Sequence, residues 1–326
     1  MAEEGHDPGH PLTWGALLTV HRERLGGWTG LAEELVRRGG GRAQLPDNLA
    51  TLERGLRRLA QKGHAPGGQY GRWVERFLGL PPETEPWLRW LGQYHSRFAD
   101  LPVSLRRRQL ELWDRPPVAG SASGIWIDLG MASVGFRAGD DAMLRARLDR
   151  AGRAAPRASV AARIEHALLR ARVNDPDGRW LEAAEDELAH PELAPEDRAS
   201  YRARTLDARA YRAMRASGRI EDGRALYEAI DIDTGIPFVD FRRALGLAYC
   251  AWKLGQPHEG ERLALEAAEH AADGGLVRFR AMAFNLASRI ALGDAAVRWR
   301  ARAGRLGAML EDEELLARVA KRDGPG

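Results

Sequence analysis

Glycine-containing turns recur at nearly constant intervals through the second part of this 326-residue chain. They contain Gly139, Gly178, Gly218, Gly255 and Gly293, so successive glycines lie 39, 40, 37 and 38 residues apart. Stretches with apolar positions at helical spacing flank each turn. Because glycine readily takes the left-handed conformation that ends a helix, each turn is expected to join two helices. The pattern predicts five helical hairpins stacked as an α-solenoid.

The rest of the chain also favours helices over strands. Runs of β-branched residues with a two-residue period are absent. Pro116 and Pro117, followed by small residues, are typical of a linker or a long turn, and six of the ten tryptophans precede them. We therefore predict an all-α protein made of a flexible N-terminus (1–11), a helical domain (12–80), connecting helices (81–120), helical repeats (121–310), and a capping helix with a tail (311–326).

Composition excludes several classes of protein. With 44% hydrophobic residues the chain is too apolar to be wholly disordered, and no apolar run is long enough to span a membrane. The first residues are acidic, unlike those of a signal peptide, so we expect a cytoplasmic protein. Cys250 is the only cysteine, so no internal disulfide can form, and we expect a buried structural thiol.

Total charge is weak evidence for nucleic-acid binding in this chain. Basic residues number 49 and acidic residues 46, and only three of the basic residues are lysines. A GC-rich genome encodes arginine at many surface positions, whatever the function of the protein. Local clustering of positive charge therefore has to support any nucleic-acid hypothesis.

Three helices are predicted within residues 12–62. The first two cover residues 12–25 and 28–38, and each ends at consecutive glycines. The third begins after Pro46, with Asp47 or Asn48 as its N-cap. Its apolar residues recur at helical spacing and predict one buried stripe: Leu49, Leu52, Leu56 and Leu59. Its other face is polar and mostly basic: Thr51, Arg54, Arg57, Arg58 and Gln61.

Three motifs in this region resemble the Cro/C1-type helix-turn-helix. They are Leu17-Leu-Thr-Val-His-Arg-Glu-Arg, Thr29-Gly-Leu-Ala-Glu-Glu-Leu and Leu52-Glu-Arg-Gly-Leu-Arg-Arg. Gly30 stands where the family usually has glutamine, and the connection before the third helix is longer than usual. The resemblance implies two sets of DNA contacts: Asp47, Asn48, Thr51 and Arg54 at base edges, and Arg57, Arg58 and Lys62 at phosphates.

The charge of this region is compatible with three interpretations. The segment from Ala50 to Leu78 contains six basic residues and only two acidic ones. Such a cluster could neutralise DNA phosphates, with steep salt dependence. It could equally be a solvated helix face, or a basic surface that docks another protein.

The repeats from about 121 to 310 resemble the tetratricopeptide family. The clearest unit runs Leu247-Ala248…Leu254-Gly255…Gly260…Ala264…Ala267, with small residues where two helices cross. Other units are degenerate, and the periods exceed that family's usual length. The resemblance implies that the first helix of each pair lines a ligand groove. Candidate groove residues are Arg170, Asn174, Arg204, Asp207, Arg242, Asn285 and Arg289, for each of which the alternative is an ordinary exposed polar side chain.

No enzyme signature is found in the sequence. Gly-x-Ser-x-Gly, P-loop, dinucleotide-binding and His-Glu-x-x-His motifs are absent, and no two of the nine histidines form a convincing metal pair. We therefore expect no catalytic residues, no metal, no cofactor and no enzymatic activity.

Together, a helix-turn-helix-like head and helical repeats resemble the peptide-responsive bacterial transcription regulators. That resemblance implies a homodimer that binds DNA and whose repeats bind a peptide, a small molecule or a protein effector. The alternative is a scaffold or adaptor that engages other proteins through both parts and does not bind DNA.

Overall fold

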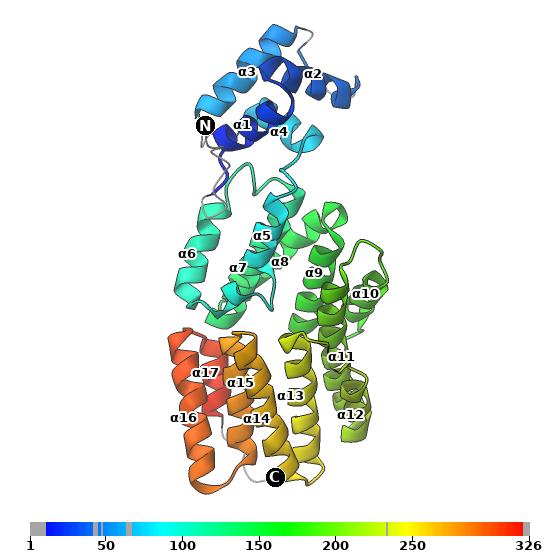
Figure 1. The fold of residues 1–326 in the computed structure, drawn as a ribbon, viewed down its shortest axis with the longest axis vertical. Coiled ribbons are helices and arrows are strands. Elements are labelled where there is room, and N and C mark those ends of the chain that lie inside the picture. Colours follow the sequence, from blue (N-terminus) through cyan, green and yellow to red (C-terminus); the bar gives the residue numbers. More distant parts are fainter. Residues whose placement is uncertain (1–10, 42–44, 47, 63–66, 233, 322–326) are drawn as a thin grey trace.

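The computed structural model describes residues 11–41, 45–46, 48–62, 67–232 and 234–321. In these ranges the regular secondary structure consists of helices, with no strand, so the all-α prediction is confirmed. The molecule is elongated, with the N-terminal helices at one end and the last repeats at the other (Figure 1). Among the described residues, no helix has the length and apolar character that a membrane span requires.

Four helices form the head, which is the domain at the N-terminal end. They are α1 (Trp14–Arg24), α2 (Trp28–Gly39), α3 (Leu49–Lys62) and α4 (Gly68–Phe77). As predicted, α3 is amphipathic, and its Leu52, Leu56 and Leu59 are buried against the other helices. The prediction was wrong for Leu49, which is 37% exposed at the first residue of the helix. Helix α3 continues through Gly55, where an added Cβ would lie 2.1 Å from the Tyr70 ring. Glycine at this position therefore lets α4 lie close to α3.

Gly30 of α2 is explained by a close approach of the backbone. A Cβ at this position would lie only 1.9 Å from the carbonyl oxygen of Leu25, the residue that follows α1 and begins the turn to α2. Any side chain here would separate the two helices, so this position requires glycine.

A connecting segment leads from the head to the repeats. It contains α5 (Thr84–Gly92), a 3₁₀-helix η1 (Arg97–Asp100) and α6 (Val103–Trp113), followed by η2 (Ala122–Gly124). The stretch after Pro117 packs closely on the body, because Val118 is buried and Ser121 accepts a hydrogen bond from the Gly124 amide.

Five helical hairpins and one further helix follow. Their bounds are α7 (Ile125–Ala138) with α8 (Asp141–Ala154), α9 (Val160–Val173) with α10 (Arg179–Leu188), α11 (Pro195–Ser217) with α12 (Ile220–Glu228), α13 (Pro237–Lys253) with α14 (Pro257–Asp273), α15 (Val277–Ile290) with α16 (Gly293–Met309), and α17 (Glu313–Ala320). A short 3₁₀-helix η3 (Ala155–Arg157) precedes α9. All five predicted turn glycines have positive φ, from 57° to 81°.

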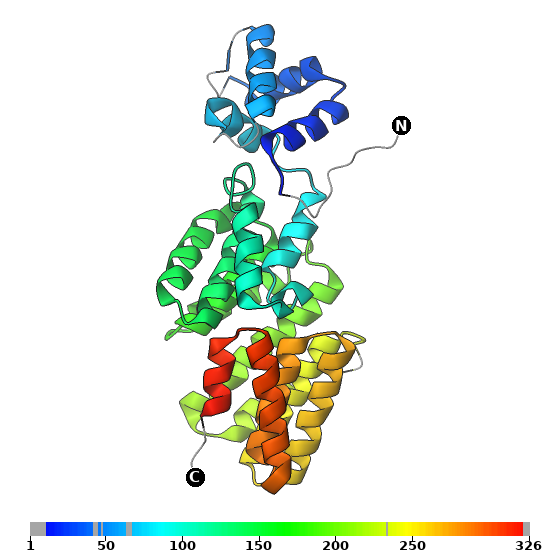
Figure 2. The ribbon, with the colours of Figure 1, turned by 90° about the vertical axis from the view of Figure 1, so that its left-hand side faces the viewer.

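The repeats curve until their last helix returns to the first. Helix α17 contacts α7, and the amide of Val103 donates a hydrogen bond to the Leu310 carbonyl at 2.9 Å. The Ser104 amide donates to Glu311 at 2.8 Å. Figure 2 shows α16 and α17 directly below the connecting helices. The connecting segment and the C-terminal helices therefore close the curve that the hairpins begin.

Substitution of Gly92 tests the contact between α5 and α7. A Cβ on Gly92 would lie 2.2 Å from the Trp126 carbonyl oxygen, so Gly92→Ala must push the two helices apart. We expect the free energy of unfolding to fall by about 1–3 kcal/mol, measured by urea denaturation. The matched control is Gly304→Ala in α16, where the nearest atom would be at 4.0 Å. This control should be neutral or slightly stabilising, and equal losses in both variants would contradict the prediction.

Candidate functional site

Helix α3 presents a stripe of polar residues on the outside of the head. Thr51, Arg54, Arg58 and Lys62 are all exposed, and their spacing places them on one side of the helix. We call these four residues the α3 stripe. Neither arginine nor Lys62 forms an ion pair with a carboxylate of the described residues. Their charges are therefore available to a partner.

The other predicted DNA contacts have local roles. Asn48 is exposed, and its side-chain oxygen accepts a hydrogen bond from the Ala50 amide at 2.8 Å, so it caps α3. Arg57 pairs with Glu53 at 3.3 Å and lies 5.6 Å from the Trp28 ring. Both residues thus have structural partners within the head. Asp47 lies outside the described residues.

Positive charge is concentrated in the head. Residues 12–80 contain eleven basic and six acidic residues, a net charge of +5, whereas the whole chain has +3. The remaining residues are therefore slightly acidic in sum. Local clustering, which the total composition could not establish, is present in the domain that contains α3.

Three predicted groove residues come together inside the closed curve of the repeats. Arg204 and Arg242 are 8% and 6% exposed, and Arg242 pairs with Asp207 at 2.9 Å. The other four lie apart from them. Arg170 pairs with Asp149, Asn174 is exposed at the end of α9, Asn285 is buried, and Arg289 lies over the Trp252 ring.

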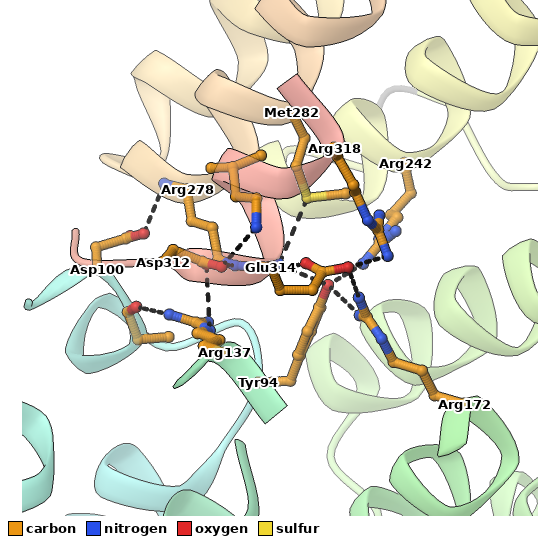
Figure 3. Close-up of polar contacts among 12 residues, drawn as sticks. Tyr94, Asp100, Arg137, Arg172, Arg242, Arg278, Met282, Asp312, Glu314 and Arg318 are labelled. Carbon is orange, nitrogen blue, oxygen red and sulfur yellow. Dashed lines mark hydrogen bonds and ion pairs between the residues drawn. The ribbon is translucent and has the colours of Figure 1, made fainter. Parts of the chain in front are cut away.

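The centre of this buried region is Tyr94, which follows α5 and was not predicted. Its hydroxyl oxygen accepts hydrogen bonds from Arg242 at 3.0 Å, Arg172 at 3.1 Å and Arg278 at 3.4 Å. The Arg204 guanidinium lies 4.6 Å from the centre of the ring. Helices α9, α11, α13 and α15 each contribute one arginine. Figure 3 shows three of them, Arg172, Arg242 and Arg278, around the Tyr94 hydroxyl. We call Tyr94 and these four arginines the Tyr94 site.

Helix α17 adds two carboxylates beside the Tyr94 site. Asp312 is fully buried and pairs with Arg278 at 2.6 Å and with Arg137 of α7 at 3.7 Å. Glu314 pairs with Arg278 at 3.1 Å and also contacts Arg318. These ion pairs join the last helix to α7 and α15, which lie at the two ends of the curve.

The surrounding arginines change the ionisation of Tyr94. Burial by itself raises the pKa of the phenol, but the guanidinium groups of Arg242, Arg172, Arg278 and Arg204 outweigh burial and lower the pKa to about 6. At neutral pH the group is therefore mostly a phenolate. A negative oxygen at the centre compensates part of the positive charge that the repeats direct inward.

One sequence signal for this site exists. Arg204, Arg242 and Arg278 are separated by 38 and 36 residues, close to the period of the turn glycines. Equivalent positions in successive hairpins point in the same direction, so a recurring arginine predicts a line of positive charge along the inner face. The tyrosine that meets them comes from outside the repeats and has no such signal.

A cavity of about 500 Å³ lies between α5 and the beginnings of α9 and α11. Its walls include Glu85, Arg89, Trp90 and Asp197. Arg89 and Asp197 pair with each other, and Glu85 accepts hydrogen bonds from Ser159 at 2.7 Å and Trp126 at 3.0 Å. The charged groups named here thus already have partners in the protein.

The remaining predicted features concern Cys250, metals and family membership. Cys250 is buried as predicted, and burial raises the pKa of its thiol to about 11. Within the described ranges, no three or more His, Cys, Asp or Glu residues are grouped so that they could hold a metal ion.

No protein-family model matches the chain, and neither a curated protein nor a solved structure matches it.

Proposed function

We propose that this chain is a DNA-binding transcription regulator whose head reads DNA with α3. The observation that supports this function best is the α3 stripe, an exposed basic row without carboxylate partners among the described residues. An α-helix fits the major groove of B-DNA, where arginine binds guanine with two hydrogen bonds. The net charge of +5 on residues 12–80 would add attraction to phosphates that does not depend on sequence.

The stripe divides by position along the helix. Thr51 and Arg54 lie near the beginning of α3, the part of a reading helix that approaches base edges. Arg58 and Lys62 lie toward its end and would contact phosphates. Because Arg57 is held by Glu53 and Trp28, its contribution would be to position α3.

The repeats would regulate the head through their closed form. Arg204 and Arg242, which were expected to line a ligand groove, are already in contact with Tyr94. An effector would therefore act by favouring either the closed or an opened arrangement of the repeats. The effector can change the free energy of DNA binding by no more than the difference between its own binding free energies for the two arrangements. A scaffold or adaptor remains the second candidate, because an acidic protein could also bind the α3 stripe.

The test compares Arg54→Ala/Arg58→Ala with the wild type in fluorescence anisotropy. Duplexes from the region upstream of the protein's own gene and scrambled duplexes would be measured at several salt concentrations, with and without extract of the producing cells. We expect the variant to lose the preference for the upstream DNA. The salt slope of its affinity should also fall by about one to two.

The matched control is Arg107→Ala/Arg108→Ala, which removes two exposed charges from α6. This variant should bind like the wild type. If DNA affinity falls equally in both variants and neither duplex is preferred, the binding is only a sequence-independent attraction between arginines and phosphates. No DNA binding by folded wild type under either condition would favour the adaptor.

A further inference from the structure

The cavity of about 500 Å³ between α5 and the beginnings of α9 and α11 has room for a small ligand. Ligand sites in proteins commonly measure roughly 300–1,000 Å³ and combine apolar walls with a few charged groups. Here Trp90, Val160 and Leu193 belong to the apolar walls, and acidic side chains supply most of the charge. We call this space the α5 cavity. Its charge and its exposed aromatic ring indicate which class of ligand it fits.

The charged side chains that line the α5 cavity are negative in sum. Arg89 and Asp197 pair with each other, so their charges cancel. Glu85 accepts hydrogen bonds from neutral donors, including the Ser159 hydroxyl at 2.7 Å, and has no cationic partner among the described residues. Glu192 is exposed and forms no ion pair within the described part of the chain. Two carboxylates at the cavity therefore keep their negative charge uncompensated.

Helix ends offset this charge only in part. The beginnings of α9 and α11 lie at the cavity, and each contributes about half a positive charge. Helix α5 lines the cavity along its length, from Glu85 to Gln93, so its two ends largely offset each other. About one negative charge remains, and a cationic ligand would compensate it.

Trp90 is the most exposed tryptophan of the chain, at 36%. Its ring lies beside those of Trp87 and Phe98, with centroids 5.0 and 5.1 Å away, and no cation of the described residues lies over it. Four partly exposed tryptophans elsewhere each lie within 5.8 Å of an arginine or lysine: Trp28, Trp180, Trp252 and Trp299. The Trp90 ring thus offers to a ligand the contact that these rings make within the protein.

We infer that the α5 cavity binds an organic cation, a guanidinium or primary ammonium group on an apolar stem. The stem packs on the apolar walls, while the cation lies over the Trp90 ring and pairs with Glu85 and Glu192. An anion would be repelled by these carboxylates, and a neutral ligand would leave them uncompensated. A small amine and the basic side chain of a peptide share this chemistry.

A ligand in the α5 cavity would connect three elements of the Tyr94 site. Tyr94 follows α5, Arg172 belongs to α9, and Arg204 belongs to α11. A cation that contacts all three helices would favour the closed arrangement of the repeats. This consequence for regulation rests on the proposed function, whereas binding of the cation does not.

The test is isothermal titration calorimetry of the full chain with two probes of the same stem. Butylguanidine is a cation, and butylurea is its neutral, planar analogue. We expect wild type to bind butylguanidine at least about ten-fold more tightly than butylurea. Trp90→Leu should weaken the binding of butylguanidine about ten-fold, and Glu192→Gln about three- to five-fold.

A capped pentapeptide with one central arginine separates the two sources of the cation. Tighter binding of the peptide than of butylguanidine would identify a peptide side chain as the ligand. Weaker binding of the peptide would identify a small amine, because the additional backbone then interferes with entry into the cavity.

Glu196→Gln is the matched control, because Glu196 is exposed at the start of α11 but does not line the cavity. It should bind butylguanidine as the wild type does. The inference fails if neither butylguanidine nor the peptide binds, if butylurea binds as well as butylguanidine, or if folded Trp90→Leu and Glu192→Gln keep the wild-type affinity. Arg54→Ala/Arg58→Ala should bind butylguanidine normally, so calorimetry separates failure of this site from failure of DNA binding.

Discussion

Replacement of Asp312 with alanine is expected to lower the free energy of unfolding by about 3–5 kcal/mol. The carboxylate is fully buried and lies 2.6 Å from Arg278 and 3.7 Å from Arg137, both of which are also buried. Its removal leaves two guanidinium groups in the interior without this counter-charge. Urea denaturation, followed by circular dichroism, measures the loss.

Two further variants separate the causes of this effect. Asp312 also accepts a hydrogen bond from the Leu315 amide at 2.9 Å and so caps α17. Asp312→Asn can keep the cap but loses the charge, and we expect it to show most of the destabilisation. Glu313→Gln removes an exposed carboxylate from the next position and should change stability by less than about 0.5 kcal/mol. A loss in Asp312→Ala as small as that of this control would refute the role of the buried pair.

Tyr94 is expected to make the stability of the protein increase with pH between about 6 and 10. The pKa of its phenol is lowered from 10.0 in the unfolded chain to about 6 in the folded protein. Between these values the unfolded state binds a proton that the folded state does not, so stability rises with pH by about 1.4 kcal/mol per unit. The contribution is complete above the unfolded pKa and is lost as pH falls through the folded one.

The comparison of wild type with Tyr94→Phe isolates this contribution. The stability difference between them should widen as pH rises above about 6 and stay constant below it. The near-ultraviolet phenolate band should be present in the wild type at neutral pH and absent from the variant. Tyr211→Phe is the control, because Tyr211 is 60% exposed. Parallel pH profiles for wild type and Tyr94→Phe would show that the phenol is not ionised.

Local structure in this protein could be predicted because it depends on neighbours in sequence. The glycine period placed the five hairpin turns, since a positive φ is costly for other residues and each turn needs one. The leucine period of α3 correctly indicated its buried side through Leu52, Leu56 and Leu59. The exposed side followed from the same spacing, and with it the positions of Thr51, Arg54 and Arg58.

Which side chains contact one another within the head could not be predicted from the sequence. Arg57 differs little from Arg58 in the sequence, yet it lies over Trp28 and pairs with Glu53. This difference depends on how α2 and α3 cross. Crossing is set by the side chains that pack between two helices, which the periodicity of a single helix does not describe.

By itself, the sequence determined that this chain is helical, where its hairpins turn and which helix faces are apolar, because hydrogen bonding and periodicity act over a few residues. Only the tertiary structure decided that the inner face is closed. Arg204 and Arg242 point inward as their repeat position implies, but Tyr94 comes from a segment more than one hundred residues earlier in the chain. Whether such a segment meets them depends on the summed rotations between hairpins, and small differences at each crossing add up over the whole curve.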